Sequence, residues 1–142
     1  MATVRLSFSP EPAHVRTARL VGVAVARRAG VAEDLLDEVR QAVGEACSRA
    51  VALHQRHGIR SLISVEMTDT SVFSVRVVDR APPDSTVPTG PLLSPDGLSE
   101  EAVAFGMGLA LLTGLVDDLE VRRAPDGEGT EVRMIWQPRQ QR

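Results

Sequence analysis

The sequence predicts a two-layer α+β domain in which helices cover one face of an antiparallel or mixed sheet. Two long segments in the first half of the chain have helical periodicity, and five short segments alternate apolar and polar residues as strands do. Their order is strand, helix, helix, strand, strand, loop, helix, strand, strand, which favours helices packed on one side of a sheet. A length of 142 residues is typical of one domain with its own core. We therefore expect residues 1–142 to form a single domain.

The first half of the chain is expected to hold one strand and two helices. Residues 4–8 alternate apolar and polar side chains before a proline-rich turn. Apolar residues then recur at helical spacing over residues 14–28, and again over residues 33–55. In this second helix Glu45 and Arg49 lie away from the apolar positions. We therefore expect both side chains on its polar side.

The second half is expected to hold two strand pairs separated by a long loop and a third helix. Four segments have strand-like alternation: 62–67, 72–78, 119–123 and 130–136. Residues 80–105 are rich in proline, glycine and serine, and a loop of this length in a small domain is typical of a lid or a binding loop. The third helix is expected to begin near 105–108 and run through Leu115. The polar tail, residues 137–142, is expected to be frayed.

Composition restricts the classes of function. The formal net charge is −3, so there is no basic surplus for nucleic-acid phosphates, and no apolar run is long enough to span a membrane. Cys47 is the only cysteine and cannot form an internal disulfide. The N-terminal residues lack the apolar stretch of a signal peptide. We expect a cytoplasmic protein that does not bind nucleic acid directly or insert into a membrane.

Three positions carry side chains or backbone suited to ligand chemistry. A glycine pair before a helix, Gly106 and Gly108, lets backbone N–H groups approach a phosphate, although such a pair also serves as a hinge or a cap. Asp79 ends an apolar strand, where its carboxylate can accept a hydrogen bond from an exocyclic amine or simply begin a turn. Glu45 can act as a general base, or it can pair with Arg49 at i, i+4 on an exposed helix face.

The order and spacing of three segments resemble the N, G1 and G2 boxes of the GHKL ATPases and kinases. These segments are 45–49, 77–82 and 106–109, and the likeness is strongest to bacterial anti-sigma factors and serine kinases. The segment 15–19 and the Gly129–Thr130 pair are also similar to actinobacterial members. The resemblance covers nearly the whole chain and implies the Bergerat ATP-binding fold.

The resemblance implies a role for each box. Glu45 would be the general base, Asp79 would accept a hydrogen bond from the adenine amino group, and Thr130 would assist through a bridging water. The phosphate end of an ATP or ADP molecule would lie at the G2 box, which comprises Gly106, Met107, Gly108 and Leu109.

The sequence departs from the family pattern in two boxes. Arg49 stands where the family has an asparagine that ligates Mg²⁺, and a guanidinium has no acceptor oxygen for a hard cation. Arg49 would instead contact phosphate directly. Ala81 and Pro83 replace glycines of the G1 box, and proline lacks an N–H group. These changes predict weak nucleotide binding that depends only weakly on Mg²⁺, with kinase activity impaired or absent.

The resemblance also implies partners. The chain would sequester a sigma factor and be released by a STAS-domain antagonist, with a homodimer formed through the sheet side. Arg16 and Arg19, on one exposed side of the first helix, would contact carboxylates of either partner, although scattered arginines are more often only solvated. Two other functions remain open: an active serine kinase that phosphorylates the antagonist, and a nucleotide-free scaffold that only binds proteins.

Other reactive side chains do not form a recognisable site. His54 and His57 are three residues apart without further ligands for zinc, so we expect solvated histidines. Cys47 is expected to be a small buried hydrophobic residue. The hydroxyls of the loop lack a paired base, so no catalytic triad is predicted.

Overall fold

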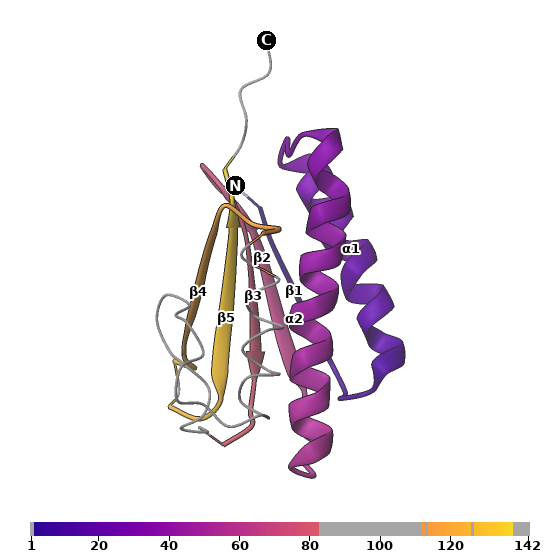
Figure 1. Cartoon of the computed structure of the whole chain (residues 1–142), viewed down its shortest axis with the longest axis vertical. Helices are drawn as coiled ribbons and strands as arrows, with labels where there is room; N and C mark the ends of the chain where they lie inside the picture. The colour runs from indigo at the N-terminus through magenta and orange to yellow at the C-terminus, as the bar shows by residue number, and fades with distance from the viewer. Residues whose placement is uncertain (1, 83–111, 113, 126, 138–142) are drawn as a thin grey trace.

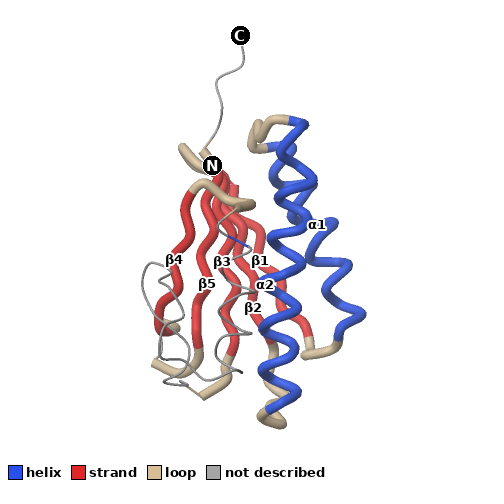
Figure 2. The backbone as a smooth tube through the Cα atoms, in the orientation of Figure 1, coloured by secondary structure: helices blue, strands red, loops and turns tan. Residues whose placement is uncertain are grey.

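Two α-helices lie side by side against one face of a five-stranded sheet (Figure 1). The computed structural model describes residues 2–82, 112, 114–125 and 127–137. Within them the elements follow in this order: β1 (Ala2–Phe8), a short 3₁₀ helix (Pro12–His14), α1 (Val15–Arg28), a second 3₁₀ helix (Glu33–Leu35), α2 (Leu36–Arg56), β2 (Ile63–Asp69), β3 (Phe73–Asp79), β4 (Asp118–Arg123) and β5 (Thr130–Trp136). The predicted two-layer α+β architecture is confirmed (Figure 2).

The five strands have the order β1-β2-β3-β5-β4, and every neighbouring pair is antiparallel. Of the two predicted kinds of sheet, the described strands therefore form the antiparallel one. The register brings Val65, Val77, Val132 and Val121 into one row across β2, β3, β5 and β4. This row is buried, which places the apolar positions of all four strands on the face that the helices cover.

The core lies between this sheet face and the two helices. Ala18 of α1 and Val39 and Val43 of α2 have no exposed surface. Gly22 of α1 keeps the helices close, because a β-carbon there would lie 3.1 Å from a methyl group of Val43. The apolar stripe of α2 predicted from helical periodicity is thus the side that faces the sheet.

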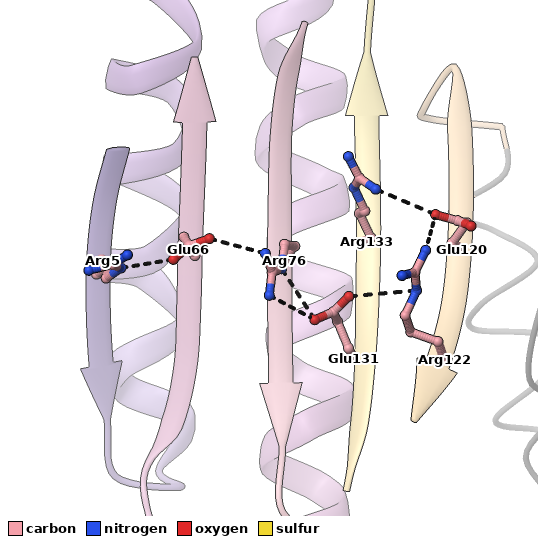
Figure 3. A network of polar contacts seen from close by, with 7 residues as sticks. All are labelled: Arg5, Glu66, Arg76, Glu120, Arg122, Glu131 and Arg133. Atoms are coloured by element: carbon pink, nitrogen blue, oxygen red, sulfur yellow. Dashed lines mark hydrogen bonds and ion pairs between the residues drawn. The ribbon is translucent and has the colours of Figure 1, made fainter. Parts of the chain in front are cut away.

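The opposite face of the sheet carries ion pairs that cross all five strands (Figure 3). The residues of this network are Arg5, Glu66, Arg76, Glu131, Arg122, Glu120 and Arg133. Glu131 lies at its centre, with Arg76 Nη2 at 3.1 Å and Arg122 Nε at 3.8 Å from its carboxylate. Ion pairs between exposed side chains, such as Arg5–Glu66 and Arg122–Glu120, contribute about 0–1 kcal/mol each, whereas Glu131 is buried beneath its arginines. A homodimer through this side stays a prediction.

The third predicted helix ends earlier than expected. Leu112 is helical, but Leu115 lies in a turn in which its N–H donates to the Leu112 carbonyl at 2.9 Å. Gly114, a poor helix residue, accounts for this end. The rest of this helix, the predicted lid from residue 83 onward and residues 138–142 lie outside the described residues. Among the described helices, none is long and apolar enough to cross a bilayer.

Candidate functional site

Arg49 of α2 is buried against the sheet, where it meets Asp79 at the end of β3. The two side chains are 7% and 1% exposed, and Arg49 Nη1 lies 3.5 Å from Asp79 Oδ2. The prediction that Arg49 lies on the polar side of α2 is therefore wrong, and so is the alternative that it pairs with Glu45. An opposite charge attracts a guanidinium more strongly in a low-dielectric interior than at the surface. Arg49 therefore pairs with the buried carboxylate of Asp79 and not with exposed Glu45.

Asp79 has several partners on the helix side of the sheet. Its Oδ1 accepts the N–H of Ala81 at 3.0 Å, a contact that begins the turn after β3. Burial raises the pKa of Asp79, while Arg49, His54 and the amides of Ala81 and Thr130 act in the opposite direction. The carboxylate is thus buried at the strand end where the resemblance places adenine, and it also serves in the turn.

The Gly129–Thr130 pair holds the backbone of β5 close to that of β3. Thr130 is the cross-strand partner of Asp79. Gly129 has φ +93°, and a β-carbon there would overlap the carbonyl oxygen of Asp79. Only glycine permits this close approach. The pair that the sequence singled out therefore fixes where the Asp79 carboxylate lies.

His54, five residues after Arg49 on α2, is completely buried, contrary to the expectation of a solvated histidine. Its Nε2 accepts the N–H of Arg80 at 2.8 Å, so Nδ1 carries the proton and donates to the carbonyl of Ser61 at 3.2 Å. Burial lowers the pKa of His54, which favours this neutral form. Both ring nitrogens find backbone partners, and these offset the cost of burial. His57 is exposed, as expected.

Glu45 is exposed and lines a hollow at the surface of the two helices. The hollow has a volume of about 430 Å³, and its other described lining residues are Arg19, Arg40, Gln41 and Leu115. Arg19 reaches across from α1 and lies over Gly44, where a β-carbon would collide with its guanidinium. Arg16 is exposed on the same helix. The structure thus brings Arg19 and Glu45 to one hollow, while the general-base role of Glu45 and the partner role of the arginines stay predictions.

The G2 box and part of the G1 box cannot be placed by the structure. Gly106, Met107, Gly108, Leu109 and Pro83 lie outside the described residues. Their predicted contacts with phosphate remain expectations.

The described side chains do not offer a site for a cation. Among them no group of three or more His, Cys, Asp or Glu residues is arranged to hold a metal ion. At the position of the family's magnesium ligand, Arg49 presents only N–H donors. These residues do not fit Mg²⁺.

Cys47, two residues before Arg49 on α2, is a buried free thiol, as expected. Burial raises its pKa to about 12, while the charge of Arg19 acts in the opposite direction. Such a thiol is not a nucleophile near neutral pH.

Comparison with known proteins places these residues in a family. The family model of the histidine kinase-like ATPase domain matches residues 8–136. Among solved structures, the RsbU and RsbW domains of Rv1364c from Mycobacterium tuberculosis align with 96% of the chain at a TM-score of 0.67 and 15% sequence identity. The match spans 32% of the length of that solved chain, and at this identity the likeness shows the fold alone. A search of curated proteins found no match.

Proposed function

Because the chain belongs to the family of histidine kinase-like ATPase domains, we propose that it is an anti-sigma regulator which sequesters a sigma factor in the cytoplasm and is released by a STAS-domain antagonist. The fold likeness to a protein with an RsbW domain supports this proposal. The net charge of −3 also favours control of transcription through a protein partner over direct contact with DNA.

The proposed regulator keeps part of an adenine-nucleotide site. Asp79 offers a buried carboxylate, and Thr130 lies beside it across the β3–β5 pair. ATP or ADP binding is expected to be weak, because the Asp79 carboxylate already has Arg49 and the amide of Ala81 as partners. An adenine ring that donates a hydrogen bond to Asp79 must compete with these two partners.

Phosphoryl transfer is proposed to be impaired or absent, and the observation that carries this is the burial of Arg49 beside Asp79. Phosphoryl transfer depends on positioning and on cationic compensation of the phosphate charge. Arg49 provides one positive charge and no oxygen ligand for Mg²⁺. Holding a nucleotide without transferring its phosphate follows from this arrangement.

A serine kinase is the second candidate, since Glu45 is exposed in a hollow and is not paired with Arg49. Incubation of the chain with its antagonist, labelled ATP and Mg²⁺ separates the two functions. We expect no transfer of label, and transfer that is lost in Glu45→Gln would overturn the account.

A nucleotide-free scaffold is the third candidate, because the Asp79 carboxylate is already paired with Arg49 when no nucleotide is bound. Calorimetry with ATP and ADP distinguishes it from the regulator. Saturable binding would exclude the scaffold, and no binding would favour it.

The surface proposed to bind both partners lies on α1. Arg16 and Arg19 are exposed there, and Leu20, one helical turn after Arg16 and next to Arg19, is 64% exposed. Two cationic side chains around an exposed apolar one suit a partner helix that carries carboxylates beside an apolar position.

An affinity pull-down from native lysate tests the proposed function. The bait is the parental chain, with Arg16→Glu/Arg19→Glu as the test variant and Arg27→Glu/Arg28→Glu, exposed at the other end of α1, as the matched control. We expect the parent and the control to retain a sigma factor and a STAS-domain protein, and the test variant to lose both. Equal retention by the test variant would show that this part of α1 is not the shared interface.

A further inference from the structure

The Arg49 guanidinium has hydrogen-bonding capacity that the described chain does not use. Its Nη1 is directed to Asp79, whereas Nε and Nη2 are buried and have no hydrogen-bond partner among the described residues. Nε and Nη2 form one edge of the guanidinium, with two parallel N–H groups. This edge is the fork that binds two oxygens of a carboxylate or a phosphate.

Asp79 does not saturate Arg49. The separation of 3.5 Å is longer than a good charged hydrogen bond, and the carboxylate also accepts the N–H of Ala81. Buried N–H groups without an acceptor are rare in folded proteins, and each calls for an explanation such as a ligand that completes them. A bound oxyanion would supply both missing acceptors at once.

The hollow next to Arg49 on α2 carries charges of both signs. Glu45 lies one helical turn before Arg49, and the hollow that it lines also contains Arg19 and Arg40. Arg40 is paired with Asp37 and Arg19 stands against Glu45, so the charges of this hollow are balanced among the described residues, and the unpartnered N–H groups of Arg49 remain the feature that calls for an anion.

We propose that the free edge of Arg49 is an oxyanion site that holds a phosphate group, of a nucleotide or of inorganic phosphate, without a divalent cation. The inference rests on the proposed nucleotide site and deepens it by assigning the group that replaces the metal. Two N–H donors and one positive charge contact two phosphate oxygens directly, so the cation that bridges phosphate and protein elsewhere in the family has no role here.

Equilibrium binding of ADP, adenosine and inorganic phosphate in the presence of EDTA tests the site. Arg49→Lys keeps the positive charge and removes the fork, and Arg28→Lys, on the exposed end of α1, is the matched control. Hydrogen bonds to charged groups contribute enough that losing the fork should weaken ADP about tenfold or more. Adenosine binding should change much less, because adenosine has no phosphate and is affected by Arg49 only through Asp79.

A measurement on the parental protein keeps the test independent of whether Arg49→Lys folds. The Nε–H resonance of Arg49 can be followed by nitrogen–proton NMR during the same titrations. We expect ADP to shift it further than adenosine, because adenosine can perturb Arg49 only through Asp79 and brings no phosphate. A shift with inorganic phosphate as well supports the site and identifies free phosphate as an occupant, and a shift with ADP alone assigns the site to the nucleotide.

The outcomes that overturn the inference differ from those that overturn the proposed function. Equal binding of ADP and adenosine, affected alike by Arg49→Lys and with the same shift of the Arg49 resonance for both ligands, removes the oxyanion site and leaves the nucleotide site standing. Binding of none of the three ligands removes both. Phosphate binding at Arg49 without ADP binding supports the oxyanion site and contradicts the nucleotide site.

Discussion

Removing Asp79 and removing Arg49 from their ion pair should lower the free energy of unfolding by different amounts. Asp79→Asn preserves shape and the acceptor for the Ala81 N–H, but it leaves a buried guanidinium without a counter-ion. Arg49→Met preserves volume and leaves the carboxylate with its backbone amides. We expect Asp79→Asn to lower the free energy of unfolding more than Arg49→Met.

The sizes follow from the contacts of each residue. Breaking a buried ion pair by removing one partner costs about 3–5 kcal/mol, and this range applies directly to Asp79→Asn. Arg49→Met also removes Nε and Nη2, whose burial without partners costs about 1–3 kcal/mol each. The raised pKa of Asp79 further allows its carboxylate to take up a proton once the arginine is gone. The loss for Arg49→Met should therefore be smaller by about 2 kcal/mol.

Urea denaturation followed by circular dichroism measures both free energies of unfolding in the absence of ligand. The double variant, Asp79→Asn with Arg49→Met, should recover much of the loss of Asp79→Asn, because no buried charge remains. A loss in Arg49→Met equal to or larger than that in Asp79→Asn would refute the view that the fork of Arg49 is unsatisfied in the free protein.

Three further predictions concern the surroundings of this pair. Gly129→Ala should cost about 3 kcal/mol or more, because its β-carbon would overlap the Asp79 carbonyl, whereas Gly58→Ala, at φ +66° in open space, should cost about 1 kcal/mol in the same urea assay. Burial lowers the pKa of His54, so as pH drops the unfolded chain takes up the proton first, and the free energy of unfolding falls below about pH 6.5. Urea titrations at about pH 7.5 and pH 5.5 measure this loss, and His54→Gln should remove the part that His54 contributes. Cys47, with its pKa raised to about 12, should react with a disulfide reagent at about pH 8 only after urea unfolds the chain, and rapid reaction in the native state would contradict its burial.

The sequence predicted the architecture well because the apolar periodicity of the described elements is unambiguous. Alternation in β2 and β3 gave the correct inward face, and the spacing along α2 gave its buried stripe. The family was also identified correctly, from the order and spacing of three short segments, and the family model matches residues 8–136. These features depend on local pattern, which a single sequence carries.

The errors at the site arise from contacts that local pattern does not contain. Helical spacing placed Arg49 beside Glu45, but its position is decided by a buried carboxylate at the end of a strand distant in the sequence. His54 was expected in solvent because no further zinc ligands accompany it, yet the backbone of Ser61 and Arg80 provides both partners that it needs when buried. A signal was present, since His54 follows Ala50 by one turn on the apolar side of α2.

Nucleotide affinity measured with Mg²⁺ and with chelator tests the central claim most directly, namely that Arg49 has replaced the metal. Calorimetric titration of ADP into the parental chain should give nearly the same affinity in both conditions. Arg49→Asn restores a carbonyl oxygen at the ligand position, so its affinity should become dependent on magnesium. Strong magnesium dependence in the parent that disappears in Arg49→Asn would contradict the account.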